Sequence, residues 1–180
     1  GSCIFSAGFS YIAFSNIFFE VSSGKMINSF KSDNEKYANW LAYSPDGHSI
    51  ALVGEGIEIW DLKDNKLKKI IPRDLASVFS VKYSYDGRYM AASELGIGIS
   101  SIFVWETKNY ELVKTFSEHK GYAVRMNFSP DGTHLASVGM DKKMFIWDLS
   151  SENPIKSIEN DTFIFTVAYS IDGQYLAIGC

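Results

Sequence analysis

The sequence has few of the residues that signal a disulfide framework, a metal site or a nucleic-acid interface. Among its 180 residues are only two cysteines and three histidines, and 17 basic against 21 acidic residues give a net charge of −4. Two cysteines are too few for a disulfide framework, so we expect reduced thiols and a cytoplasmic protein. The acidic balance argues against general binding to nucleic acid, because such proteins usually present a basic face.

A long apolar run is also missing, although residues 1–19 carry no charge. A membrane-spanning helix needs about 20 mostly apolar residues. Polar residues interrupt this stretch at five positions: Ser2, Ser6, Ser10, Ser15 and Asn16. A signal peptide would need a basic start, which is absent here. We therefore expect no membrane association, and we interpret the segment as a degraded copy of the repeat described next.

The chain does contain a repeat with a period of 40 to 45 residues. One motif recurs four times: an aromatic residue, a serine, one variable residue and an Asp-Gly pair. Its aspartates are Asp46, Asp86, Asp131 and Asp172, at successive intervals of 40, 45 and 41 residues. A second mark, tryptophan followed by an acidic residue, recurs at intervals of 45 and 42 residues, with Trp60, Trp105 and Trp147. Two independent marks with one period predict a repeated structural unit.

Each repeat has the pattern of a small antiparallel sheet. Asp-Gly between two apolar runs predicts a hairpin, because glycine accepts a positive φ and aspartate hydrogen-bonds to its own turn. In the first clear repeat, strands are expected at residues 50–53, 57–60 and 67–71, and one more strand precedes the turn. No stretch shows a helical period, so four short strands per repeat predict an all-β fold. A β-sandwich is the structural alternative, but it would not explain the period.

These residues resemble the WD-repeat family, in which a period of about 40–45 residues forms one four-stranded blade of a β-propeller. The resemblance covers essentially the whole chain. It implies about four and a half antiparallel blades in an incomplete ring, with boundaries near 1–31, 32–72, 73–117, 118–159 and 160–180. In the first blade, Phe5-Ser6 is aligned with Tyr43-Ser44, and Phe19-Glu20 with Trp60-Asp61. We expect a fragment of a longer protein; the alternative is a small ring closed by its own ends or by a second copy.

One repeat carries the family's hydrogen-bonded chain, which implies a structural network of His119, Ser137, Asp141 and Trp147. The alternative for His119 is an ordinary loop histidine. The other repeats depart from the pattern, because Asn34, Asp74 and Asn160 stand at the histidine position, and Gly54 and Ile99 at that of Asp141. We expect those blades to depend on packing and to be less stable.

No catalytic, cofactor-binding or metal-binding residues are predicted, because the chain lacks metal-ligand spacings and a glycine-rich nucleotide motif. The resemblance implies a non-catalytic scaffold that binds protein partners, with no nucleic-acid, membrane or small-molecule ligand. The first alternative is an accessory propeller of a larger enzyme or signalling protein whose catalytic domain lies outside these residues. The second is an enzyme that uses the central channel of the propeller. The residues expected to face that channel, given below, are mostly apolar or small, which argues against this alternative.

In this family, partners contact the rim where each innermost strand begins. The matching positions, with one more from the neighbouring loop, are Tyr37, Ser77, Tyr122, Phe163 and Met140. Exposed aromatic residues bury much area at little entropic cost and often carry binding energy. A second column is expected to face the central channel, with Asn39, Phe79, Val124 and Phe165. Packing between blades is an equal alternative for Tyr122 and the favoured one for Phe163 and Phe165.

Overall fold

The period of the sequence becomes a series of antiparallel sheets in the computed structural model. The structure describes residues 3–6, 15–20, 22–31, 38–54, 56–71, 77–94, 96 and 98–180. Every element that these residues form is a β-strand, and the strands make five separate sheets. The described part of the chain therefore contains no helix that could cross a membrane. The all-β fold class is confirmed.

The sheets follow one another along the chain, each with its strands in sequence order. The first sheet contains β1 (Cys3–Ser6), β2 (Ser15–Glu20) and β3 (Met26–Lys31). The second contains β4 (Trp40–Tyr43), β5 (Ser49–Val53), β6 (Ile57–Asp61) and β7 (Lys66–Ile71). The third contains β8 (Val78–Tyr83), β9 (Tyr89–Glu94), β10 (Ser100–Glu106) and β11 (Leu112–His119). The fourth contains β12 (Ala123–Phe128), β13 (His134–Gly139), β14 (Lys143–Asp148) and β15 (Pro154–Glu159), and the last contains β16 (Thr166–Tyr169) and β17 (Leu176–Gly179).

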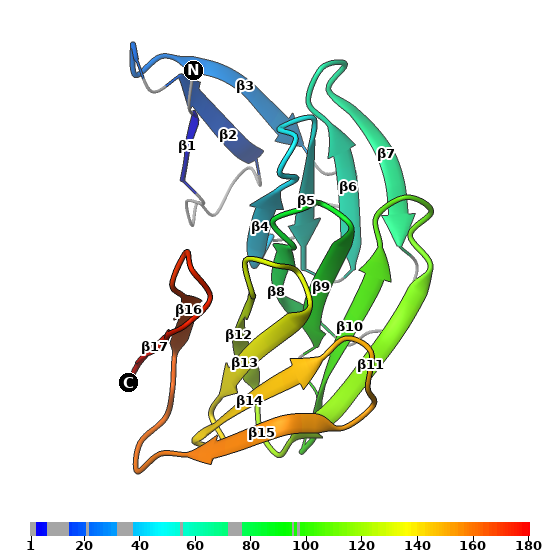
Figure 1. Ribbon diagram of the computed structural model, residues 1–180. Coiled ribbons are helices and arrows are strands. Elements are labelled where there is room, and N and C mark those ends of the chain that lie inside the picture. Colours follow the sequence, from blue (N-terminus) through cyan, green and yellow to red (C-terminus); the bar gives the residue numbers. More distant parts are fainter. Residues whose placement is uncertain are drawn as a thin grey trace.

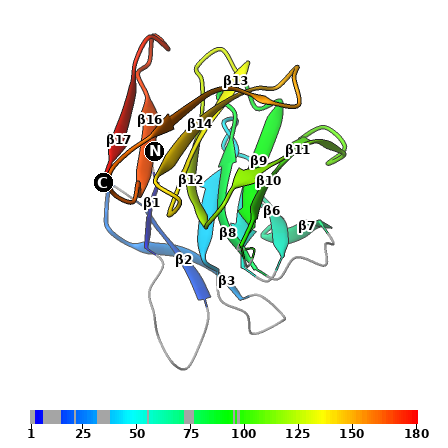
Figure 2. The same cartoon turned by 90° about the horizontal axis from the view of Figure 1, so that it is seen from below.

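The sheets form an open arc around their first strands. Contacts between sheets run from β4 to β8, from β8 to β12 and from β12 to β16. The last strands of the four-stranded sheets lie at the outside of the arc, as Figures 1 and 2 show for β7 and β11. The first and last sheets do not join, so the ring is not closed (Figure 1). This is the arrangement of propeller blades that the period predicts.

The four Asp-Gly turns have the same conformation. Their glycines have φ between +71° and +72°, at Gly47, Gly87, Gly132 and Gly173. Each glycine N–H donates to the serine carbonyl three residues earlier, and each aspartate accepts the N–H two residues later at 2.9 to 3.1 Å. Successive turns also pack on one another, since Gly87 lies against Pro45 and Gly173 against Pro130. The predicted hairpins are therefore confirmed.

The tryptophans of the second mark occupy equivalent places. Each stands opposite the second residue of the preceding strand, in the pairs Trp60–Ile50, Trp105–Met90 and Trp147–Leu135. Each also follows a shift of register against the next strand and pairs with the residue seven positions later, which is Leu67, Leu112 or Pro154. Phe19 repeats this geometry in the first sheet, because a register shift precedes it and it pairs with Met26.

The first sheet corrects one detail of the repeat alignment. It has three strands, and β1 pairs directly with β2, so that Ile4 stands opposite Phe19 as Ile50 stands opposite Trp60. β1 therefore occupies the place of the second strand of a blade, and the alignment of Phe5-Ser6 with an innermost strand is wrong. The physical reason is that no Asp-Gly pair follows Phe5 in the sequence, so the signal that specifies the hairpin of the other repeats is missing there.

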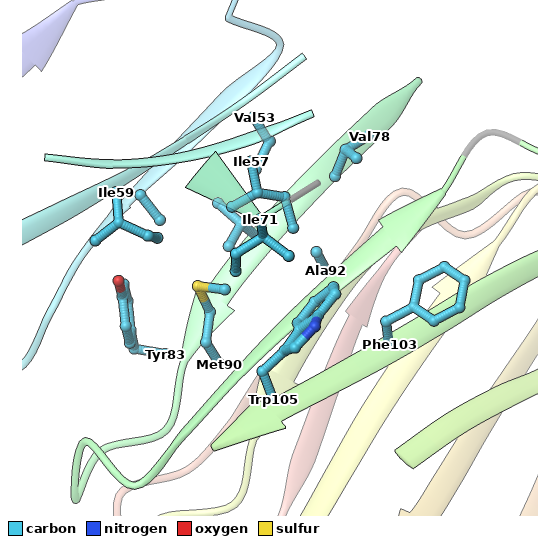
Figure 3. Packing of buried hydrophobic residues seen from close by; sticks show 12 residues of the cluster. Val53, Ile57, Ile59, Ile71, Val78, Tyr83, Met90, Ala92, Phe103 and Trp105 are labelled. Atoms are coloured by element: carbon cyan, nitrogen blue, oxygen red, sulfur yellow. The ribbon is translucent and has the colours of Figure 1, made fainter. Parts of the chain in front are cut away.

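The core lies between adjacent sheets, and the third and fourth sheets bury residues on both of their faces. On β10, Phe103 and Trp105 enter the cluster shared with the second sheet, whereas Ile102 and Val104 enter the cluster shared with the fourth. Figure 3 shows the first of these clusters, in which Met90 and Trp105 face residues of the second sheet. Burying each large apolar side chain contributes about 1.5–3 kcal/mol relative to exposure. These clusters hold the sheets at fixed positions around the inner edge of the arc, which we call the hub: the region where the first strands β4, β8 and β12 lie next to one another.

Candidate functional site

A largely buried polar network joins the end of the third sheet to the fourth, because His119 ends β11 while Ser137 and Trp147 lie on β13 and β14. Ser137 lies at its centre: its hydroxyl is 2.9 Å from Trp147 Nε1 and 2.8 Å from His119 Nε2. His119 Nδ1 is 2.9 and 3.0 Å from the two carboxylate oxygens of Asp141. The structure thus brings together the four residues that the resemblance implied. His119, Ser137 and Trp147 are completely buried.

One assignment of donors and acceptors gives each side chain of the network a hydrogen-bond partner. The Trp147 indole N–H can only donate, so the Ser137 oxygen accepts from it. The Ser137 hydroxyl can then donate to His119 Nε2, with His119 Nδ1–H donating to Asp141. Burial raises the pKa of Asp141. Hydrogen bonds from His119 and from the Lys143 and Lys120 N–H groups lower it by more, so the net pKa lies below the usual value. The carboxylate is therefore held ionised as the end of a structural chain.

Packing leaves little room around this network. The Phe116 ring stacks on Trp147 with 4.4 Å between centroids, and Phe145 meets His119 edge-on at 4.8 Å. Gly139 ends β13 beside the histidine, where a Cβ atom would lie 2.6 Å from the Tyr122 carbonyl oxygen and 3.0 Å from His119 Nδ1. Only glycine fits this position without a shift of backbone. No sequence pattern marks Gly139, since the need for glycine there arises from contacts between residues distant in the sequence.

Three of the predicted rim residues are exposed on adjacent segments of backbone, and we call them the rim patch: Tyr122, Met140 and Phe163. Their exposed fractions are 42%, 38% and 49%. Backbone hydrogen bonds hold the three segments together, because the Met140 N–H donates to the Tyr122 carbonyl and the Ile164 N–H donates to that of Gly139. Met140 directly precedes Asp141, so the buried network fixes the loop that presents the patch.

The other predicted rim positions differ from this patch. Tyr37 lies outside the described residues. Ser77 is partly buried, and its hydroxyl accepts a hydrogen bond from Asn39 Nδ2 at 3.2 Å. The same Asn39 amide donates to the Val78 carbonyl at 2.9 Å, so it links the second sheet to the third. Ser77 is thus already engaged in a contact between blades.

The expectation for the channel column needs correction at one position, Val124. Phe163 and Phe165 meet edge-on with 6.4 Å between centroids, yet about half of each side chain is exposed, so packing accounts for only part of their surface. Val124 does not face the channel, because it is 4% exposed and belongs to the core between the last two sheets. A register shift between Ala123 and Arg125 turns the chain at this point, which the sequence did not reveal.

Arg125 lies at the inner edge of the arc instead. Its guanidinium carbon lies 3.7 Å from the ring centroid of Trp40 and 5.4 Å from that of Phe79. These aromatic residues belong to β4 and β8, so side chains from the first strands of three sheets meet at the hub. Burial lowers the pKa of Arg125. The sequence analysis gave no role to Arg125 or Trp40, because their meeting depends on the curvature of the arc.

Titratable groups at the opposite end of the sheets serve their own turns. A cavity of about 420 Å³ between the last two sheets is lined in part by Asp131, His134 and Asp172. Hydrogen bonds from Ser129 and Thr133 lower the pKa of Asp131 to about 2, and bonds from Ser170 and the Gln174 N–H lower that of Asp172. Both carboxylates are therefore ionised acceptors, poorly suited to deliver protons. Among the described residues no cluster of three or more potential ligands could hold a metal ion.

Comparisons with known proteins fit this geometry. A sequence profile of the family described as "WD domain, G-beta repeat" matches residues 110–148, which include all four network residues. The chain is also 26% identical over 151 residues to Protein groucho of Drosophila melanogaster, an alignment that covers 81% of this chain and 20% of that protein. The chain thus spans about a fifth of the length of this relative.

Proposed function

We propose that this chain is a WD-repeat protein-interaction scaffold with no catalytic activity of its own, and that its rim patch is the contact surface; the repeat profile over residues 110–148 and the similarity to Protein groucho support this. The observation that carries the proposal is the exposure of Tyr122, Met140 and Phe163 side by side on a rigid support. Exposed apolar patches on a folded surface often mark interaction sites. The network residues have a supporting role, because they are buried and satisfy one another's hydrogen bonds.

The support matters for affinity as well as for shape. Ordering mobile side chains or loops on binding costs free energy, so a surface that is already fixed binds more tightly. Asp141 accepts the N–H of Lys143 within its own turn and that of Lys120 in the connection between β11 and β12, so the loop around Met140 is tied to the neighbouring connection. A partner that contacts Met140 therefore meets a loop held in one conformation. Truncating a central aromatic contact of an interface typically costs about 2 kcal/mol or more.

The test is quantitative affinity purification with the full-length protein as bait. We compare the wild type with the substitutions Tyr122→Ala and Phe163→Ala, which remove exposed rings from the rim patch. Tyr85→Ala is the matched control, because Tyr85 is 56% exposed but lies in an Asp-Gly turn at the other end of the sheets. We expect the rim variants to lose partners that the control retains. Equal retention by all variants would exclude the rim patch, and a wild type that enriches no protein over an unrelated bait would exclude the scaffold role.

We also propose a cytoplasmic location for this part of the protein. Cys180 is a free, exposed thiol, which is compatible with a reducing compartment. Fluorescence microscopy of the tagged full-length protein, together with cell fractionation, checks this directly. Recovery of the protein mainly in the nuclear or membrane fraction would contradict it.

A further inference from the structure

The hub of the arc holds a cation in an unusual setting. Arg125 extends from β12 across the first strands of the neighbouring sheets, so its guanidinium lies over Trp40 and near Phe79. Stacking of a guanidinium on aromatic faces is favourable, and more so where water is partly excluded. Trp40 keeps 38% of its surface exposed, so the stacked pair is reachable from the channel. The pair is therefore positioned as a surface, not as part of the sealed core.

Arg125 also has unused hydrogen-bonding capacity. Its Nη1 donates to the Val124 carbonyl at 2.6 Å. In the part of the chain that the structure describes, no carboxylate forms an ion pair with it, whereas Arg88 pairs with Asp86 and Lys143 with Glu159. A guanidinium has five N–H donors in a planar fork. A half-buried cation without an anion pays a desolvation cost that an incoming carboxylate would reduce.

We propose that Arg125 is the anion-binding position of the central channel and takes the side-chain carboxylate of a partner's peptide segment. This deepens the scaffold function proposed above and rests on it. The fork of the guanidinium accepts a carboxylate through two parallel hydrogen bonds. The exposed part of the Trp40 ring takes the apolar residue next to the acidic one. Because Tyr122 lies three residues before Arg125, one segment can contact both the rim patch and the hub.

The charge favours a carboxylate as the anion. A single guanidinium balances the single negative charge of one aspartate or glutamate. Sites that read phosphorylated segments generally use clusters of arginines, and Arg125 is one of only three arginines in the chain, with Arg73 and Arg88. Arg88 lies in an Asp-Gly turn, at the opposite end of the sheets. A phosphorylated segment remains the competing source of negative charge, and the experiment includes it as a separate arm.

The first experiment selects peptides from a random phage-displayed library on the immobilised full-length protein. The baits are the wild type, Arg125→Gln and the matched control Arg88→Gln, which removes an arginine that also stands over a ring, that of Tyr89. We expect the wild type and Arg88→Gln to enrich sequences with aspartate or glutamate beside an apolar residue. We expect Arg125→Gln to lose this enrichment. Circular dichroism of each bait checks that all three are folded.

The second experiment measures affinity with the most enriched peptide by fluorescence anisotropy. Two comparison peptides are measured alongside it: the same peptide with amides in place of the carboxylates, and a version with phosphoserine at the acidic position. Losing a charge-assisted hydrogen bond predicts about tenfold weaker binding of the acidic peptide to Arg125→Gln. The amide peptide should bind the wild type and Arg125→Gln alike. Arg125→Lys should recover part of the affinity, because it restores the charge but not the fork.

Each contrary result has a defined meaning. Selections without acidic enrichment, or an equal loss of binding in Arg88→Gln, would overturn the proposal. Peptides that depend on Tyr122 but not on Arg125 would overturn it while leaving the rim patch intact as an interface. Tighter binding of the phosphoserine peptide than of the acidic one would overturn the assignment of the anion as a carboxylate. Failure of every bait to select peptides would also count against it, whereas the scaffold role is judged by the affinity purification alone.

Discussion

Replacing Ser137 with alanine isolates the contribution of the buried network. The substitution removes one oxygen and keeps the backbone and the neighbouring apolar contacts, so the cavity it leaves is small. It deprives two completely buried groups of their partner, namely the Trp147 indole N–H and His119 Nε2. A buried polar group left unpaired costs about 1–3 kcal/mol. We therefore expect the free energy of unfolding to fall by about 2–4 kcal/mol, which is large beside a typical total of about 5–15 kcal/mol.

Urea unfolding followed by tryptophan fluorescence and circular dichroism measures the effect. With a slope of about 1–3 kcal/mol per molar urea, the midpoint of Ser137→Ala should fall by about 1–2 M. The chain offers a matched control in Ser93, which lies on the corresponding strand of the neighbouring sheet and is also completely buried. Its hydroxyl has no hydrogen-bond partner among the described residues. We expect Ser93→Ala to be neutral or slightly stabilising, because it removes an unpaired polar atom.

The comparison of these two serines can refute the reasoning. If Ser93→Ala and Ser137→Ala lower the midpoint equally, the loss reflects the general effect of trimming a buried serine and not the network. A double-mutant cycle sharpens the test. In a Trp147→Phe background the indole donor is already gone, so Ser137→Ala should cost less than in the wild type. Strict additivity of the two substitutions would show that the hydrogen bond between them contributes nothing measurable.

Three further changes probe other parts of the structure. Gly139→Ala places a Cβ 2.6 Å from the Tyr122 carbonyl oxygen, so we expect a loss of several kcal/mol, about 2–4, from backbone displacement, measured by thermal unfolding. Acid should destabilise the fold, because the pKa of Asp131 is lowered to about 2. The stability that its ionised form contributes is present above about pH 4 and is lost as the pH falls towards 2. The substitution Asp131→Asn should flatten this part of a curve of unfolding free energy against pH. Asn39→Ala removes the amide that donates to the Val78 carbonyl, so amide hydrogen exchange should quicken where the second and third sheets meet, with an expected cost of about 1 kcal/mol.

The sequence was informative where a local pattern determines local structure. An Asp-Gly pair specifies its turn through its own φ angles and its own side-chain hydrogen bonds, so the four hairpins could be placed without knowledge of the rest of the chain. The spacing of the tryptophans placed the strand that bears each of them. The first repeat lacks the Asp-Gly pair, and there the alignment of Phe5 failed while that of Phe19 agreed with the observed register.

Features that arise between sheets could not be read in this way. Val124 was expected in the channel, but a bulge turns it into the core and leaves Arg125 at the hub. The meeting of Arg125 with Trp40 joins residues 85 positions apart in the sequence, and it depends on how far each sheet is rotated from the last. The exposure of Phe163 likewise depends on which neighbour covers it, and periodicity carries no information on that point.

The register shows which residues of the other sheets stand where Ser137 accepts the indole N–H of Trp147. The register places Leu52 and Ala92 where the fourth sheet has Ser137, so neither can accept the indole N–H. In the second sheet, Trp60 Nε1 donates instead to the Glu58 carboxylate at 3.0 Å. Glu58 and Trp60 are two residues apart on β6 and therefore share a face of the strand. This partner was readable from the sequence, since strand alternation alone places the two side chains together. Glu58 is only partly buried, so a carboxylate is tolerated there beside the indole, whereas Trp147 is completely buried and its hydrogen bonds reach the Asp141 carboxylate only through Ser137 and His119.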